Sequence, residues 1–257
     1  MMGRTHAASG WCAGLAVAPL IDAGGLGPAV TFASVTTGAA LLPDIDHLEA
    51  TISRALGPIT RGVARLVRGL SSAVYRTTRT DRDGRGTGKH RYLTHTLAFS
   101  LLLGMLTTVL TAVGGPWAVG TVAVLAVLLA GKALGWWVLA AATAGTLLVS
   151  VLGDLPQLLA GMELKLGIAI TLGCIVHILG DWITEAPVPM LWPLKIQGRR
   201  WYPCNAPAAV RFEVNSPTEL KLVFPAFVVL GVLLVPGAFG LAVEAVTTLL
   251  DHTTTDN

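Results

Sequence analysis

The stretch AVTFASVTTGAALLPDIDH (residues 29–47) joins an apolar run to three side chains that can bind a metal ion, Asp44, Asp46 and His47. Ionisable groups beside an apolar segment are costly to bury and tend to be functional. Helix capping is the simpler interpretation of the two aspartates. Asp46 and Glu49, three residues later, resemble a capping box at the start of a further amphipathic helix.

The composition is that of an integral membrane protein. Apolar residues make up 53% of the 257 residues and charged residues only 13%. Several apolar runs approach the roughly 18–20 residues that a helix needs to cross a bilayer. The runs lie at residues 7–21, 29–42, 97–113, 117–131, 133–152, 164–182 and 222–250. We therefore expect an all-α, polytopic helical membrane protein with short helical hairpins, the first formed by residues 7–42.

The positive charge is concentrated in one segment. Residues 48–95, the basic segment, contain ten of the eighteen Lys and Arg residues. Short basic loops stay on the cytoplasmic side of a membrane, so we expect this segment on the cytoplasmic face. An anchor for a partner protein is an alternative role. Aromatic residues do not alternate with the arginines as in nucleic-acid-binding segments, so we expect no nucleic-acid partner.

The topology predicts that the histidines and aspartates meet. If the run 97–113 begins inside, the runs up to residue 182 cross out, in, out and in again. Candidate side chains at the ends of these runs then lie on the cytoplasmic face together with the basic segment. They are His6, Asp44, Asp46, His47, His90, His95, His177 and Asp181.

The spacing of these residues allows metal binding and also simpler roles. His177 and Asp181 are four residues apart, so on a helix they share a face and can supply two ligands, or form a packing pair joined by a hydrogen bond. His90 and His95 are five apart, which leaves a structural or solvated role open. The three cysteines show no metal-binding spacing. Histidine and aspartate ligands without cysteine suit Zn²⁺, Mn²⁺ or Fe²⁺ better than Mg²⁺ or Ca²⁺.

Five motifs occur in an order that is typical of one family. They are Thr5-His6, Leu42-Pro-Asp-Ile-Asp-His47, His90-Arg-Tyr-Leu-Thr-His95, His177-Ile-Leu-Gly-Asp-Trp-Ile-Thr184 and Leu191-Trp-Pro-Leu194. Over residues 1–200 this set resembles the YdjM-type membrane-bound metal-dependent hydrolases. The resemblance implies a helical inner-membrane protein with a zinc-dependent hydrolase site, distantly similar to the phospholipase C and P1 nuclease fold. Tyr92, Thr96 and Glu185 stand where that family usually has Gly, Ser and Pro.

The resemblance and the residues together suggest a mechanism. We expect one to three zinc ions to activate a water that attacks a phosphoester or a lipid-like ester. The expected ligands are His6, Asp44, His90, His95, His177 and Asp181. Asp46 or His47 is expected to act as a general base or to orient a ligand. Arg91 is expected to bind an anionic oxygen of the substrate, or alternatively a lipid headgroup. The expected partners are membrane lipids and a small-molecule or lipid substrate.

The non-enzymatic alternative is a membrane protein whose metal site is structural or serves ion transport. Transporters usually place such ligands near the middle of the bilayer, whereas these lie at the ends of the apolar runs. We expect residues 1–200 to form the membrane-embedded hydrolase domain, with residues 75–89 as a flexible inserted loop. Residues 201–257 are expected to form an interfacial loop, a C-terminal membrane hairpin and a disordered tail.

Overall fold

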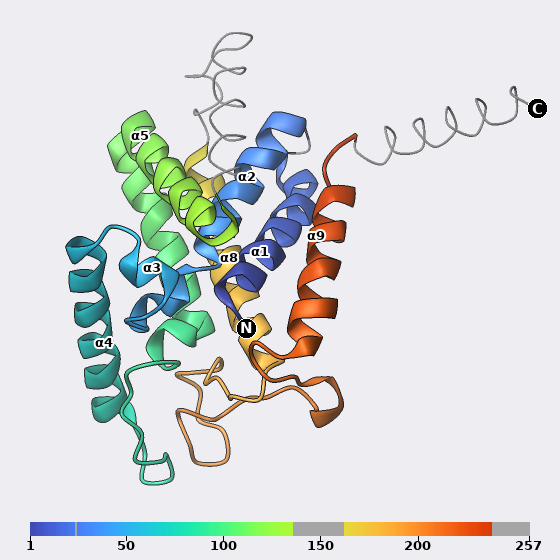
Figure 1. The fold of residues 1–257 in the computed structure, drawn as a ribbon. Coiled ribbons are helices and arrows are strands. Elements are labelled where there is room, and N and C mark those ends of the chain that lie inside the picture. The colour runs from blue at the N-terminus through green and yellow to red at the C-terminus, as the bar shows by residue number, and fades with distance from the viewer. Residues whose placement is uncertain (24, 136–161, 238–257) are drawn as a thin grey trace, which may run out of the picture.

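A computed structural model describes residues 1–23, 25–135 and 162–237 of the chain (Figure 1). The described part is mostly helical, and its β-structure is confined to three isolated bridges. In chain order the helical elements are α1 (Gly3–Val17), η1 (Ala18–Ile21), α2 (Leu26–Ala39), η2 (Leu42–Asp46), α3 (Thr51–Arg54), α4 (Pro58–Thr78), η3 (Leu93–His95), α5 (Leu97–Leu134), α8 (Met162–Trp182), η4 (Ala208–Val210), η5 (Glu219–Val223) and α9 (Phe224–Leu233). The predicted all-α fold class is confirmed.

The predicted N-terminal hairpin is present as α1 and α2, which pack side by side (Figure 1). The turn between them contains Asp22 in the left-handed conformation (φ 55°). Small residues allow the two helices to approach closely, because a Cβ added at Gly10 would lie only 2.8 Å from the Cβ of Ala40. The hairpin returns the chain to its starting side, so His6 and Asp44 lie at the same end.

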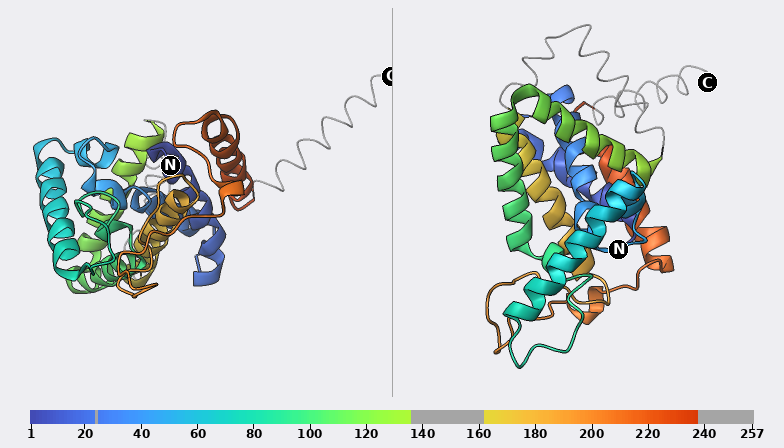
Figure 2. Two further views of the ribbon diagram at one scale, coloured as in Figure 1. Left: turned by 90° about the horizontal axis from the view of Figure 1, so that it is seen from below. Right: turned by 90° about the vertical axis from the view of Figure 1, so that its left-hand side faces the viewer.

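Helix α5 contains both of the apolar runs predicted at residues 97–113 and 117–131. A break at Gly115, where φ is 59° and ψ is −153°, separates its two halves, and Pro116 follows as the first residue of the second half. Glycine tolerates this positive φ, and proline is well suited to a first helical position. The second half folds back across the bundle (Figure 2).

Three segments are long and apolar enough to cross a membrane: Leu26–Asp46, Leu97–Leu134 and Met162–Trp182. Helix α8, which forms the third, packs against α5, α2 and α1. The first and third segments end, and the second begins, at the same end of the bundle, as the predicted topology requires. Most of the run predicted at 133–152, and the predicted C-terminal hairpin and tail beyond residue 237, fall outside the described residues.

The predicted capping box at Asp46 and Glu49 is wrong. The next helix is the short α3, whose N-cap position is Ala50 and receives no side-chain hydrogen bond. The Asp46 carboxylate is instead buried within the structure. The long amphipathic helix of the basic segment is α4, which begins at Pro58, a residue suited to the first helical position because it needs no hydrogen-bond acceptor for its nitrogen.

The segment predicted as a flexible insert, residues 75–89, begins inside α4 and returns along it. The hydroxyl of Ser71 donates to the Gly88 carbonyl (2.7 Å), and that of Ser72 donates to the Thr87 carbonyl (2.8 Å). Between these points the buried carboxylate of Asp83 accepts hydrogen bonds from the backbone N–H groups of Arg200 and Trp201. The flexibility of this segment stays a prediction.

Helix α4 packs against the rest of the molecule through aromatic side chains. Tyr75, Leu93 and Trp201 form a buried cluster, with Trp192 and Tyr92 packed against it. The ring centroids of Tyr75 and Trp201 are 5.4 Å apart and those of Trp192 and Trp201 are 5.1 Å apart. Burial of large aromatic rings is strongly stabilising, so α4 is held beside the end of the bundle where η2 and η3 lie.

Candidate metal centre

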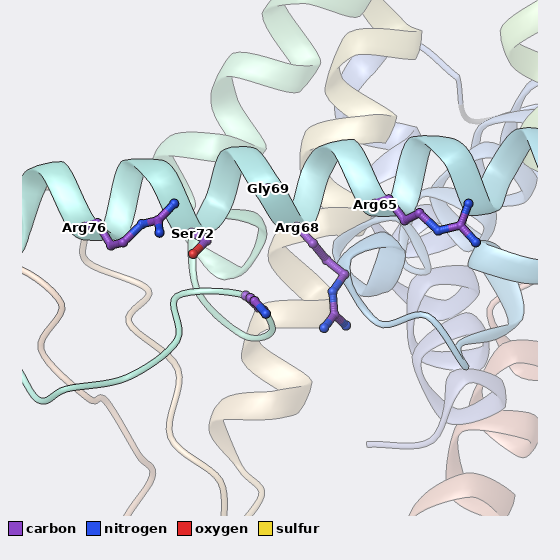
Figure 3. A pocket seen from close by; sticks show the side chains of 6 residues that line it. Arg65, Arg68, Gly69, Ser72 and Arg76 are labelled. Carbon is purple, nitrogen blue, oxygen red and sulfur yellow. The ribbon is translucent and has the colours of Figure 1, made fainter.

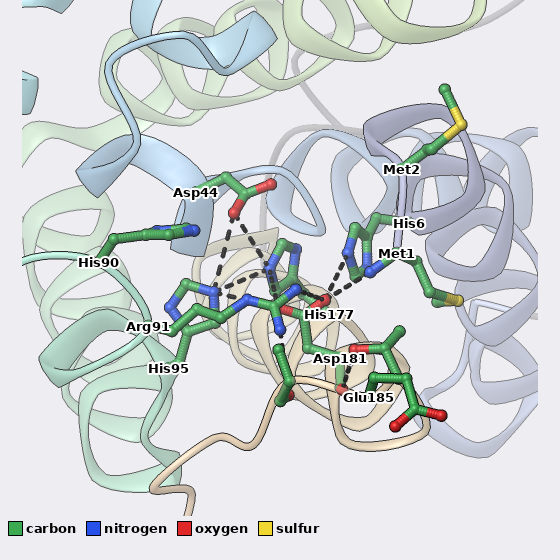
Figure 4. Close-up of polar contacts among 12 residues, drawn as sticks. Met1, Met2, His6, Asp44, His90, Arg91, His95, His177, Asp181 and Glu185 are labelled. Atoms are coloured by element: carbon green, nitrogen blue, oxygen red, sulfur yellow. Dashed lines mark hydrogen bonds and ion pairs between the residues drawn. The ribbon is translucent and has the colours of Figure 1, made fainter. Parts of the chain in front are cut away.

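Four elements bring the predicted ligands together at one end of the bundle (Figure 4). His6 comes from the first turns of α1. Asp44 comes from the 3-10 helix η2, which follows α2 and has Pro43 in its first turn. His95 lies in η3, immediately before Thr96, whose side chain caps α5 by accepting a hydrogen bond from the Phe99 N–H (3.1 Å). The last two turns of α8 supply His177 and Asp181.

The first group of ligand atoms consists of Asp44, His95 and His177. The Nε2 atoms of His95 and His177 face each other at 3.3 Å, and both rings are fully buried. Asp44 Oδ1 lies 3.8 Å from Nε2 of His95 and 3.7 Å from Nε2 of His177. Two nitrogens and one carboxylate oxygen therefore point at a common location.

Hydrogen bonds at the other ring nitrogen determine which tautomers His177 and His90 adopt. Nδ1 of His177 lies 2.8 Å from the Ala40 carbonyl, which can only accept, so Nδ1 carries the proton. Nδ1 of His90 lies 2.7 Å from Oδ1 of Asp46, and an ionised carboxylate also only accepts. In the neutral form both rings therefore have their lone pair on Nε2.

Thr94 fixes the tautomer of His95 in the same way. Its hydroxyl donates its single proton to Oδ2 of the buried Asp46 (2.8 Å). The hydroxyl oxygen can then only accept from Nδ1 of His95, which lies 3.0 Å away. Neutral His95 therefore also has its lone pair on Nε2. Thr94 was not singled out by the sequence analysis, although its place inside the motif ending at His95 was a signal.

This arrangement fits a bound cation. The lone pairs of His95 and His177 repel each other at 3.3 Å unless a proton or metal ion lies close to both. Nitrogen ligands of a tetrahedral zinc ion, at about 2.0–2.1 Å from the metal, lie roughly 3.3–3.4 Å from each other. The separation and the tautomers therefore fit two histidine ligands of one metal ion of this size.

His6, His177 and Asp181 form a second group of ligand atoms. The ring of His6 stacks on that of His177 with centroids 3.7 Å apart, and its Nε2 lies 3.3 Å from Oδ1 of Asp181. Both ring nitrogens of His6 and Oδ2 of Asp181 are buried without a hydrogen-bond partner. Buried polar atoms without partners are destabilising, and a metal ion bound to one ring nitrogen of His6 and to Oδ2 of Asp181 would satisfy two of these three atoms. The amino group of Met1 lies 2.5 Å from Oδ1 of Asp181.

Carboxylates surround His95 closely. Burial lowers the pKa of this imidazole, but the neighbouring Asp181, Asp46 and Asp44 outweigh burial and raise it above its ordinary value. The centre therefore attracts positive charge to the Nε2 atom, where a proton and a metal ion compete for the same lone pair.

A comparison with protein families matches residues 1–241 to the YdjM inner membrane proteins. The chain belongs to this family. No curated protein and no solved structure matches the chain. The match continues past residue 200, where we placed a domain boundary, and that division stays a prediction.

In this YdjM-family protein the metal centre is closed on one side and open on the other. The side chains of His6, His95, His177 and Asp181 are at most 1% exposed, whereas those of Asp44 and His90 are 22% and 33% exposed. Asp44, Asp46 and His90 form a third group of ligand atoms on the open side. The centre is therefore accessible to solvent past Asp44 and His90.

The two remaining predicted residues flank the centre. Nη2 of Arg91 donates to Oδ1 of Asp181 (3.0 Å), while its Nη1 donates to the Ala186 carbonyl (3.0 Å). The ring of His47 lies against that of His90, with centroids 4.6 Å apart. All the predicted site residues therefore lie in or beside one cluster, and their chemical roles stay predictions.

Proposed function

We propose that this YdjM-family protein is a zinc-dependent hydrolase of the inner membrane that cleaves a phosphoester or a lipid-like ester. The observation that carries the proposal is the pair of Nε2 atoms of His95 and His177, which face each other at 3.3 Å beside Asp44. Nδ1 of each ring is held by a hydrogen-bond partner, which leaves Nε2 available as a ligand atom.

The ligands would be His6, Asp44, His90, His95, His177 and Asp181, holding one to three ions. Two of the groups of ligand atoms, which share His177, consist only of these residues. When bound, zinc acts as a Lewis acid and lowers the pKa of a coordinated water to about 7. The identity of the metal rests on the ligand set, because nitrogen and carboxylate ligands suit zinc, with manganese and iron as alternatives.

Asp46 positions the ligands in this proposal. Its two oxygens accept hydrogen bonds from Nδ1 of His90, the N–H of Arg91 and the hydroxyl of Thr94. Both oxygens are therefore occupied and fully buried, which favours the orienting role over that of a general base. Carboxylates that hold histidine ligands in this way tune metal affinity by roughly 10–100-fold.

His47 and Arg91 would act on the substrate. His47 is partly exposed beside His90, so it is the better candidate for accepting a proton from the attacking water. Arg91 is partly exposed, and its guanidinium carries donors beyond the two used by Asp181 and Ala186. A free pair of guanidinium donors suits the bidentate recognition of a phosphate oxygen pair.

We place the centre on the cytoplasmic side of the membrane. The support comes from charge, because the chain between Asp46 and His90, most of which belongs to the basic segment, begins and ends at the centre. Segments rich in Lys and Arg stay on the cytoplasmic side. A site at this interface is accessible to lipids and to other amphiphilic esters.

The experiment measures bound zinc and turnover of a chromogenic phosphodiester by protein purified in detergent. Asp44→Asn is compared with Asp22→Asn, because the same change is made at opposite ends of the α1–α2 hairpin. We expect stoichiometric zinc and turnover in the wild type and in Asp22→Asn, and the loss of both in Asp44→Asn. A wild-type protein that binds no zinc when zinc is supplied would overturn the proposal.

The non-enzymatic alternatives give different results in the same preparation. Bound zinc without turnover of phosphodiester or carboxylic ester substrates would indicate a structural metal. Zinc flux into liposomes that contain the protein, abolished in Asp44→Asn and retained in Asp22→Asn, would indicate transport.

A further inference from the structure

A second concentration of charge lies outside the metal centre, in a pocket of about 310 Å³ along α4 (Figure 3). We call it the α4 pocket. Its lining residues are Arg65, Arg68, Gly69, Ser72, Arg76 and Lys89. The side chains of the three arginines project from the same side of the helix (Figure 3).

The wall opposite α4 is fixed in place. The hydroxyls of Ser71 and Ser72 donate to the carbonyls of Gly88 and Thr87, directly before Lys89. Gly88 lies against the Tyr75 ring in a left-handed conformation (φ 67°), which glycine adopts without strain. Lys89 is therefore held close to the arginines of α4 by backbone contacts.

Among the residues that the structure describes, no carboxylate neutralises the cations of the α4 pocket. The lining contains four cationic side chains and no carboxylate. Within the described part of the chain, Arg65, Arg76 and Lys89 take part in no salt bridge. Arg68 donates to the backbone carbonyl of Asp46, at 3.2 Å. Like charges held together without anions repel, so this arrangement favours a bound anion, and guanidinium groups are best matched by phosphate.

The same helix has an apolar stripe that the protein does not cover. Ile59, Val63, Leu66 and Leu70 follow one another at helical spacing and are 70%, 45%, 74% and 57% exposed. A helix that combines cationic and apolar surface in this way is typical of the interface between lipid headgroups and acyl chains. An exposed apolar stripe on the same helix as a pocket of cations thus favours a lipid over a soluble anion.

We propose that the α4 pocket binds the headgroup phosphate of an anionic phospholipid, while the apolar stripe of α4 contacts the acyl chains. The pocket adjoins the metal centre, because Lys89 directly precedes His90 and Arg68 contacts the backbone of Asp46. The lipid bound here need not be the molecule that is cleaved, so the proposal stands independently of the hydrolase.

The test uses the full-length protein in detergent and measures lipid binding by native mass spectrometry. The probes are dihexanoyl phosphatidylglycerol, dihexanoyl phosphatidylcholine, glycerol phosphate and inorganic phosphate. We expect the anionic lipid to bind most tightly. Arg65→Gln with Arg76→Gln should lower the affinity for this lipid about twenty- to thirtyfold, since each basic group near a lipid surface raises the affinity roughly fivefold.

Control variants distinguish the effect of the pocket residues from that of overall positive charge. Arg79→Gln with Arg85→Gln removes the same charge from exposed residues that do not line the pocket, and should leave lipid binding unchanged. Arg65→Lys with Arg76→Lys keeps the charge and should retain most of the binding. Leu66→Gln with Leu70→Gln should weaken the binding of the lipid and leave the binding of glycerol phosphate unchanged. Unchanged zinc content and unfolding temperature would show that each variant is folded.

Three outcomes would overturn the proposal. Equal binding of phosphatidylcholine would exclude selection of an anionic lipid. Inorganic phosphate or glycerol phosphate that binds as tightly as the lipid would identify a soluble anion as the ligand. Equal weakening by the pocket variant and by Arg79→Gln with Arg85→Gln would show diffuse attraction to the basic segment instead of a defined pocket.

Discussion

The metal centre and the α4 pocket adjoin each other and are built on opposite principles. The metal centre combines histidines with carboxylates of the opposite charge, and most of these side chains are fully buried. The charged side chains that line the α4 pocket are all cationic, and the pocket is open to the surface. A buried centre requires every polar atom to be satisfied, whereas exposed cations remain solvated. Substitutions should therefore be costly in the first region and mild in the second.

The largest effect is expected for Asp181→Asn. Asp181 contacts His6 and Arg91 and is the carboxylate that α8 contributes to the centre. Because the change removes a ligand charge, zinc affinity should fall by at least about 100-fold, beyond what the loss of an orienting group causes. Competition with a chelator of known affinity measures it. Unchanged affinity would remove Asp181 from the ligand set.

A smaller effect is expected for Asp46→Asn, because Asp46 orients ligands in the proposed mechanism. An amide cannot accept hydrogen bonds at both of its atoms, so either His90 or Thr94 loses its acceptor. Zinc affinity should fall by roughly 10–100-fold. Asp83→Asn is the matched control, because Asp83 is also buried and accepts backbone hydrogen bonds, but outside the metal centre. Equal loss of zinc in both variants would contradict the positioning role.

Asp83→Asn should itself reduce stability. Burial raises the pKa of the Asp83 carboxyl, but N–H donation from Thr80, Trp201 and Arg200 outweighs burial and lowers it below 3.8. The stabilisation is therefore fully present above pH 3.8 and is lost as the pH falls through the lower folded-state pKa. At neutral pH the variant should lose about 2 kcal/mol of unfolding free energy.

Thermal unfolding in detergent checks this, at neutral pH and at a pH below 3.8. The difference between wild type and Asp83→Asn should narrow in acid. A difference that is independent of pH would show that the ionised carboxylate is not the source of the stabilisation.

The smallest effect is expected on the apolar stripe of α4. Leu66→Ala with Leu70→Ala should change the free energy of unfolding in lipid-free detergent by no more than about 0.5 kcal/mol, because both side chains are mostly exposed. Leu166→Ala is the control, since Leu166 is 1% exposed within the core and its truncation should cost about 2–5 kcal/mol. Similar losses in both would show that the stripe is covered by protein.

The helical fold and the meeting of the ligands followed from simple features of the sequence. Apolar runs and the Gly- and Pro-containing breaks between them located the α1–α2 hairpin, both halves of α5, and α8. The number of crossings then placed His6, Asp44, His95 and His177 at one end, and the structure brings their ligand atoms together. These inferences depend on the lengths of the apolar runs and on whether the number of crossings is odd or even, and both can be read from a single sequence.

Other features depend on contacts between distant residues. The spacing of Asp46 and Glu49 matched a helix cap, yet the carboxylate instead binds His90 and Thr94, more than forty residues away. Tyr75 and Trp201 likewise pack together across a long stretch of sequence. The local sequence pattern cannot indicate such partners, because it describes only neighbouring residues and is the same whether or not a distant side chain makes contact.

The contact between Asp46 and His90 also bears on how this protein could diversify. The chain leaves the metal centre at one of these residues and re-enters at the other, although 44 positions separate them and their side chains are 2.7 Å apart. A connection whose two ends meet can grow, shrink or be exchanged at small thermodynamic cost, because each doubling of loop length adds only about 0.6 kcal/mol. The segment that contains α4 is thus a module in which recognition can evolve while the ligands beneath it stay in place.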